Sequence, residues 1–238
     1  MKANLQDQKH LLELAQIDLD LVKNASDRAK LLAATDVQIA SERALALSDQ
    51  LIDARNKVGD LELELKRSEN DLELVETRIT KDQERLATTS SSKDAQGIEH
   101  ELATLKKRKS ELEDAQLGIM EELDVVRAGL RAAESAKSAA EAELSALRAL
   151  LSSNTSNLDT ERAELSAKRV GLVGLIDPEL AEAYQKKANR NVAVGKLTGR
   201  ECGACRISIT ATNLEEIVAL PEDEIAECPN CQAYLVRS

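Results

Sequence analysis

Four cysteines near the end of the chain have the spacing of metal ligands. They form two CxxC pairs, Cys202 with Cys205 and Cys228 with Cys231. Both sulfurs of one such pair can point at the same ion from a single tight turn, and two pairs supply the four ligands of a tetrahedral structural site. The spacing therefore predicts one structural Zn²⁺ ion with no open coordination position for catalysis.

Two other uses of these cysteines remain open. A redox CxxC motif usually begins a helix that follows a strand in a βαβ unit, and the sequence lacks that setting. A rubredoxin-like iron site would use the same four sulfurs, and the spacing alone does not separate iron from zinc. All four cysteines lie in the last 37 residues, and in a reducing cytoplasm such a set favours a metal over disulfides.

The residues around the cysteines predict the short elements that must position them. The run Asp177-Pro178-Glu179 supplies an N-cap, a first-turn proline and an acidic residue, so a short helix should extend from there to about residue 190. We expect a helical turn at 213–218 and strands at 191–197, 206–210, 225–226 and 234–236. Residues 173–238 are therefore predicted to be a short helix followed by a C4 zinc ribbon.

Basic residues gather around the first cysteine pair. Positive charge on one face is the electrostatic footprint of a surface that contacts phosphate or an acidic partner. No aromatic residues interleave with these cations, so base stacking is not supported, and a mixed solvated surface explains them equally well. The candidate contact residues are Lys186, Lys187, Arg190, Lys196, Arg200 and Arg206.

The chain before residue 173 predicts a long helical hairpin. Apolar residues spaced alternately by four and three extend from Val37 to Leu86 and again from Ile98 to Leu165. This spacing averages 3.5 residues per turn, so each stripe needs a partner helix. The polar stretch at 88–97 is typical of a turn between arms of similar length. We therefore predict an antiparallel coiled-coil hairpin over residues 1–172, which makes the protein mainly α.

The pattern also predicts two details of the hairpin. If Leu86 packs opposite Ile98, then Ser68 and Gln116 share a layer, and a polar pair there would help to fix the register. A change in the phase of the apolar stripe at 22–36 indicates that the supercoil relaxes locally in the first arm.

The composition limits the function classes. The chain has no Phe or Trp, two Tyr and 32% charged residues, with a net charge of −11, which argues against indiscriminate attraction to nucleic acid. It has neither an apolar run of membrane-spanning length nor a signal-peptide pattern. We expect a cytoplasmic protein without membrane contact. No arrangement of general acid, base and nucleophile points to an enzyme or a small-molecule substrate.

Three stretches carry a family pattern: 11–18, 99–124 with its Glu-Leu-Glu-Asp-Ala-Gln-Leu-Gly-Ile-Met-Glu-Glu core, and 199–237 with both cysteine pairs. Together they resemble the bacterial family of proteins that join a long N-terminal coiled-coil hairpin to a C4-type zinc ribbon. The resemblance assigns the metal-ligand role to the four cysteines. The family usually has glycine and then arginine after the last cysteine, whereas this chain has Gln232 and Ala233, so any contact made by that arginine is in doubt.

The resemblance implies an elongated adaptor or regulator, since some relatives are associated with transcription factors, RNA, or the assembly of secretion and flagellar machinery. We therefore expect a non-enzymatic zinc-binding protein that scaffolds macromolecular partners, such as transcription or secretion and assembly machinery. The alternative is a nucleic-acid-binding regulator that uses the basic residues beside the zinc ribbon. Binding that weakens steeply with salt would favour this alternative.

Overall fold

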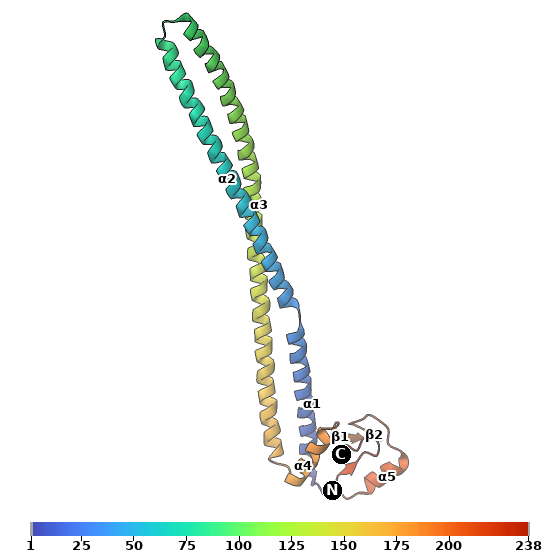
Figure 1. Ribbon diagram of the computed structural model, residues 1–238. Coiled ribbons are helices and arrows are strands. Elements are labelled where there is room, and N and C mark those ends of the chain that lie inside the picture. Colours follow the sequence, from blue (N-terminus) through green and yellow to red (C-terminus); the bar gives the residue numbers. More distant parts are fainter. Residues whose placement is uncertain (1, 238) are drawn as a thin grey trace. The chain divides into compact units, whose positions relative to one another are not determined.

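The computed structural model describes residues 2–237 and confirms the mainly α fold, with a long helical hairpin followed by a small strand region that carries the cysteines (Figure 1). Its helices are α1 (Leu5–Ala33), α2 (Asp36–Thr88), α3 (Ser92–Val173), α4 (Pro178–Ala188) and α5 (Ala211–Ala219). Its strands are β1 (Val194–Thr198), β2 (Glu201–Cys202), β3 (Ala226–Glu227) and β4 (Tyr234–Val236). The contacts divide the chain into two compact units, Thr35–Arg148 and the combination of Met1–Ala34 with Ala149–Ser238.

The unit formed by residues 35–148 is the antiparallel pairing of α2 with the first part of α3. Seam positions such as Leu51 and Leu112 are buried, as the 3.5-residue period requires. Ion pairs flank this seam, and the Lys109 ammonium lies 2.7 Å from the Glu76 carboxylate. Glu76 is one residue from Val75, the position that the predicted register places opposite Lys109. The helices are therefore aligned close to the register expected from their apolar stripes.

The turn of the hairpin is shorter than the polar stretch that indicated it. Helix α2 ends at Thr88 and α3 begins at Ser92, so residues 93–97 are helical. The Ser91 hydroxyl accepts a hydrogen bond from the Asp94 amide at 3.4 Å, and the Ser91 carbonyl accepts one from Ala95 at 2.9 Å. An N-cap serine followed by a first-turn aspartate favours helix formation. These two residues explain why α3 begins before the end of the polar stretch.

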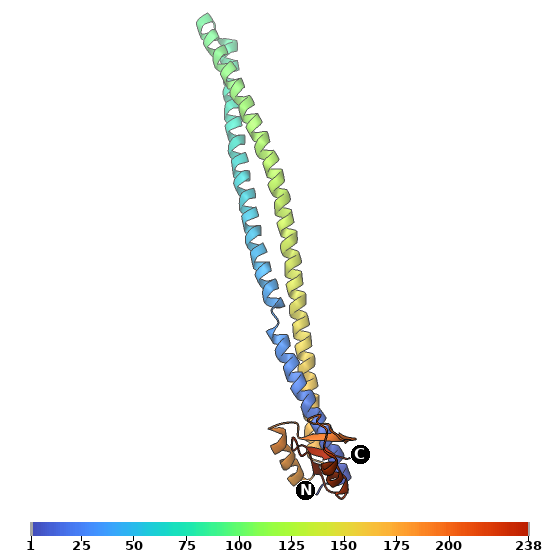
Figure 2. The same ribbon diagram turned by 90° about the vertical axis from the view of Figure 1, so that its right-hand side faces the viewer.

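In the other unit, α1 and the end of α3 lie side by side and antiparallel (Figures 1 and 2). The Asn24 side-chain amide donates to the Leu158 carbonyl at 3.0 Å and to Glu161 Oε2 at 2.8 Å. The Arg28 guanidinium lies 2.7 Å from the Asp159 carboxylate. Helix α1 ends at Ala33, within the range where the stripe changes phase, and Ala34 is extended. Polar contacts therefore replace the regular apolar seam near this end of α1.

Helix α4 forms as its sequence predicts and covers the sheet. The Asp177 carboxylate accepts hydrogen bonds from the amides of Glu179 and Leu180 at 2.9 and 3.3 Å, and Pro178 begins the helix. The buried residues of α4, Leu180 and Tyr184, join one hydrophobic core with residues of α1 and of two strands. The other large members of this core are Leu11, Leu14, Ile176, Val194, Ile225, Tyr234 and Val236.

The sheet has the strand order β2-β1-β4-β3, with β1 parallel to β4 and each edge strand antiparallel to its neighbour. The strand predicted at 234–236 is confirmed, those at 191–197 and 225–226 are shifted, and α5 extends the predicted helical turn. The strand predicted at 206–210 is wrong. Arg206 has a left-handed φ of 60°, which interrupts an extended chain, and Ser208 forms only an isolated bridge with Glu201.

The first residues of the chain attach to the loop before β3. The Ala3 amide donates to the Asp223 carbonyl at 2.7 Å, and the buried Gln8 amide donates to the Glu222 carbonyl at 2.8 Å. Lys2 also forms an isolated β-bridge with Glu224. These contacts fix the beginning of α1 against the strand region. Within residues 2–237, none of the helices is both long and apolar enough to span a membrane.

Candidate metal centre

Two turns of the same construction carry the four cysteines. In the first turn the Arg206 amide donates to the Cys202 carbonyl at 2.7 Å, and in the second the Gln232 amide donates to the Cys228 carbonyl at 2.9 Å. Arg206 and Gln232 also share a left-handed backbone, with φ values of 60° and 62°. Each turn therefore closes one residue after its second cysteine. This closure leaves both thiols of a pair on the same side of the turn.

The turns bring the four thiols into one cluster. All four sulfur atoms lie within 4.8 Å of one another, and the Sγ atoms of Cys202 and Cys231 are 3.9 Å apart, as are those of Cys205 and Cys228. A disulfide would need about 2.05 Å. Four sulfurs at about 2.3 Å from a tetrahedral ion would be about 3.8 Å apart. The donor set and its spacing therefore fit a single metal ion.

Apolar residues enclose one half of the cluster. Cys202 and Cys228 are buried in a second hydrophobic core, whereas Cys205 and Cys231 are half-buried. The large apolar members of this core are Leu197, Ile209, Ile217 and Leu235. The first cysteine of each pair is thus anchored beneath the surface, and the second cysteine is nearer to solvent.

The thiols differ in acidity. Burial raises the pKa of Cys202, and it raises the pKa of Cys231 to about 12. At Cys228 burial acts in the same direction, but the amides of Cys231 and Asn230 and the neighbouring thiols outweigh it and lower the pKa. Because metal-bound cysteines are thiolates, an ion that binds all four sulfurs must displace protons from this cluster.

Two glycines let the first cysteine turn pack directly on β1. The Gly203 amide donates to the Lys196 carbonyl at 2.9 Å. A Cβ atom added at Gly195 would lie 2.3 Å from the backbone nitrogen of Ala204, and one added at Gly203 would lie 2.7 Å from the Lys196 oxygen. Only a residue without a side chain fits at these positions. The glycines therefore set the distance between the first cysteine turn and the sheet.

The six basic candidate residues are not equivalent in the structure. The Lys187 ammonium donates to the Gln232 carbonyl at 2.6 Å, pairs with Glu227 at 3.2 Å and lies 4.5 Å from the centroid of the Tyr234 ring. The Arg200 guanidinium donates to the Ile209 carbonyl at 3.2 and 3.3 Å. These two cations hold the strand region together.

The other four basic residues are exposed. Lys186 pairs with Glu182 at 2.7 Å on α4. Within the described chain, Arg190, Lys196 and Arg206 have no ion pair or side-chain hydrogen bond. Lys186, Lys187 and Arg190 line one pocket of about 280 Å³ that also includes Cys231, whereas Lys196, Arg200 and Arg206 lie outside it.

Arg237 has a structural role that the sequence pattern did not reveal. Its guanidinium donates to four backbone carbonyls, which belong to Ile217, Leu220, Pro221 and Glu224, at distances of 2.5 to 2.9 Å. It thereby joins the end of α5 to the loop before β3. A lone arginine at the end of a chain has no spacing signal that would predict these contacts.

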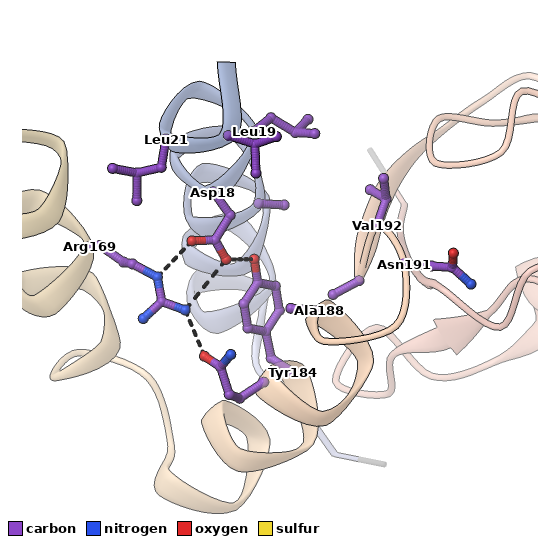
Figure 3. A pocket seen from close by; sticks show the side chains of 12 residues that line it. Asp18, Leu19, Leu21, Arg169, Tyr184, Ala188, Asn191 and Val192 are labelled. Carbon is purple, nitrogen blue, oxygen red and sulfur yellow. Dashed lines mark hydrogen bonds and ion pairs between the residues drawn. The ribbon is translucent and has the colours of Figure 1, made fainter. Parts of the chain in front are cut away.

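A polar network joins three helices beside the sheet (Figure 3). The Arg169 guanidinium of α3 donates to Asp18 Oδ1 of α1 at 2.6 Å and to Gln185 Oε1 at 2.6 Å. The Tyr184 hydroxyl of α4 donates to the other oxygen of Asp18 at 2.7 Å. Both carboxylate oxygens of Asp18 are therefore satisfied, and the network forms one side of a groove that Leu19 and Val22 of α1 also line.

The helical hairpin and the cluster of four cysteines define an α-helical hairpin protein with a candidate structural metal centre. The chain belongs to the family of the CT398-like coiled coil hairpin domain, whose model matches residues 14–192. The cysteine turns lie beyond the matched residues, so the family match supports the hairpin, and the geometry of the four thiols supports the metal centre.

The relatives and solved structures cover almost the whole chain. Uncharacterized proteins from two strains of Mycobacterium tuberculosis, one of them Rv2229c, are 34% identical over 241 residues, which covers 100% of this chain and 98% of theirs. A solved structure from Mycobacterium smegmatis is similar with a TM-score of 0.72 and 28% identity, and it covers 100% of both chains. CT398 from Chlamydia trachomatis, at a TM-score of 0.53, 16% identity and 98% coverage of both chains, shares the fold.

Proposed function

We propose that this protein is a non-enzymatic, zinc-binding adaptor or regulator that scaffolds macromolecular partners. The observation that carries the proposal is the closed set of four protein thiols, all within 4.8 Å of one another. Four thiolate ligands complete a tetrahedral shell, whereas a catalytic zinc keeps a position for water or substrate. The metal centre then serves to hold a binding platform in shape.

Zinc is the ion that we propose for this centre. Soft thiolate ligands in a tetrahedral S₄ set select zinc or iron, and zinc is the common structural ion of paired CxxC turns. Free thiols of this kind suit the reducing cytoplasm, where we place the protein. Metal analysis of the purified protein should find about one zinc ion per chain, and Cys228→Ser should remove most of it. Iron in the wild-type protein would contradict this assignment.

The helices provide the second part of the proposal. Long exposed helical faces suit lateral binding of helical partners, and a small rigid sheet suits recognition of a folded or extended segment. Proteins that act in transcription or in the assembly of secretion machinery are the partners that we propose. We propose no enzymatic role, because four thiolates that bind one ion are not available as nucleophiles.

The test is affinity purification of the full chain from its native cytoplasm, with and without nuclease. Wild type and Cys228→Ser are compared, since the variant lacks one ligand. Protein partners that survive nuclease and are lost in Cys228→Ser would support an adaptor. Recovery of no protein partner by the wild-type chain would contradict the adaptor proposal.

A nucleic-acid-binding regulator is the second candidate, because Arg190, Lys196 and Arg206 are exposed cations without partners in the described chain. Such binding should weaken steeply with salt and with charge reversal of Lys196 and Arg206. Arg200 is a poor test residue because its guanidinium bonds the Ile209 carbonyl. Affinity for RNA that does not change in Lys196→Glu and Arg206→Glu would exclude these residues as the contact.

A further inference from the structure

A groove of about 420 Å³ lies between α1, α4 and the segment before β1 (Figure 3). Its apolar side chains include Leu19 and Val22 on α1 and Val192 before β1, which are 47%, 69% and 37% exposed. Large apolar side chains in a concave site are the usual anchors for a ligand. The volume also lies within the range of preformed binding pockets.

Four of the polar residues that line the groove, Asp18, Arg169, Tyr184 and Gln185, are engaged with one another. Asp18 receives hydrogen bonds from Arg169 and Tyr184, and Arg169 also bonds Gln185. This network ties three helices together, so the groove is preformed. Because the Asp18 charge is paired, the surface offered to a ligand here is chiefly apolar. A charged group of a ligand would lose its hydration in the groove and would gain little binding free energy in return, because the charges there are already paired.

A basic pocket continues from the groove. Asn191 and Val192 line both sites, and the second pocket adds Lys186 and Arg190. Arg190 has no charged partner in the described chain, and the Lys186 side chain is 72% exposed despite its pairing with Glu182. An exposed ion pair of this kind contributes little free energy, so Lys186 can exchange Glu182 for a ligand. Both cations are therefore able to contact a ligand. They are local positive charges on a chain of net charge −11.

We infer that the groove and the basic pocket together bind a short acidic peptide segment of a partner protein. Apolar side chains of the segment occupy the groove beside Leu19, Val22 and Val192, and neighbouring carboxylates face Lys186 and Arg190. The inference rests on the proposed adaptor function and specifies the chemistry of its partner. A nucleic acid would match the cations but has no aliphatic group for the groove, and the pocket lacks aromatic residues for stacking.

The experiment selects peptides from a random phage-displayed library on the full-length, zinc-loaded protein and measures their affinities. We expect enrichment of peptides that combine aliphatic residues with nearby Asp or Glu. Val22→Asp should weaken these peptides about tenfold or more, because it places a like charge in the groove, and the double variant Lys186→Glu, Arg190→Glu should do the same. Binding should also weaken with salt.

Two variants serve as matched controls. Val170→Asp changes a valine of similar exposure, 72%, that does not line the groove, and Arg131→Glu reverses an exposed charge in the other unit. Both should leave peptide affinity unchanged. Circular dichroism and zinc content of every variant establish that it is folded.

Three results would overturn the inference. Peptides that bind equally to wild type and Val22→Asp would place the contact elsewhere, and the adaptor proposal would stand. If no peptide is selected, the groove is not a peptide-binding site. The adaptor proposal would then still be decided by the affinity purification. Binding of a single-stranded oligonucleotide that depends on Arg190, without peptide binding, would assign this surface to nucleic acid.

Discussion

Arg237 performs several structural roles with a single side chain. Its planar guanidinium presents donors in fixed directions, and it bonds the carbonyl of Ile217 in the last turn of α5 and three carbonyls that follow the helix. Buried carbonyls without partners are costly, and charged donors form the stronger hydrogen bonds. The loop that receives Ala3 and Gln8 is therefore held in place by a residue near the opposite end of the sequence.

At the residue scale, we predict that Tyr184→Phe lowers the free energy of unfolding by about 1 to 2 kcal/mol at neutral pH. The substitution removes the hydroxyl that donates to Asp18 at 2.7 Å and leaves the ring in the core. Chemical denaturation measures the loss. Arg169 still pairs with Asp18 in the variant, so a much larger loss would mean that the ring itself had been displaced.

Tyr184→Phe also tests how ionisation of Tyr184 contributes to the pH dependence of the free energy of unfolding. Burial raises the pKa of Tyr184 above its ordinary value, followed in importance by the hydrogen bond to Asp18. The neutral phenol is therefore favoured in the folded state. The stability that it contributes is fully present below pH of about 10 and is lost as the pH rises above that value. Wild type should lose stability more steeply than Tyr184→Phe in this range, and equal slopes would contradict the assignment.

At the scale of elements, the contact between β1 and the first cysteine turn determines where the thiols lie. We predict that Gly195→Ala lowers zinc affinity at least about tenfold, a shift of about 1.4 kcal/mol, because its Cβ would lie 2.3 Å from the Ala204 nitrogen. Competition with a zinc chelator measures the change. Gly129→Ala is the control, since nothing lies within 4 Å of its added Cβ, and it should stabilise α3 by up to about 1 kcal/mol.

The register of the hairpin can be tested at the same scale. Ser68 and Gln116 are both half-buried, and the Ser68 hydroxyl oxygen is buried without a hydrogen-bond partner, as expected for a polar seam position. Cysteines at these two positions should form a disulfide within one chain under mild oxidation. Gel electrophoresis with and without reductant distinguishes this product from a dimer. Cross-linking only between chains would exclude the predicted pairing.

At the scale of the molecule, the metal centre and the hairpin should respond differently to zinc removal. Two small cores hold the strand region, and the second of them contains Cys202 and Cys228. We expect a strand region of this size to depend on the proposed zinc ion for much of its folding free energy. We predict that chelation increases hydrogen exchange throughout residues 194–237, while the helical signal of circular dichroism is largely retained.

Restored zinc should reverse this change, and Cys228→Ser should reproduce it without a chelator. Amides of residues 35–148 are the internal control, because they form a separate compact unit. Protection of residues 194–237 that persists without metal would show that the hydrophobic cores suffice. Equal loss of protection in both units would contradict the independence predicted here.

The sequence by itself determined the elements whose signals are local. A 3.5-residue period specifies helices that need partners, Asp177-Pro178-Glu179 specifies the start of α4, and the CxxC spacing specifies a cluster of thiols. Each of these signals depends on side chains a few residues apart. For that reason these elements could be predicted without knowing the fold. The short strands were predicted less well, since some observed strands are shifted by a few residues and the strand predicted at 206–210 does not form.

Only the tertiary structure decided the contacts between distant parts of the chain. Asp18 accepts hydrogen bonds from Arg169 and Tyr184, which are 151 and 166 residues away in the sequence. Gln8 donates a hydrogen bond to the carbonyl of Glu222, which is 214 residues away. The left-handed backbone at Arg206 and the close approach at Gly195 also depend on the packing of the cysteine turn on β1. Such contacts have no sequence period, because they arise from the packing of one element on another.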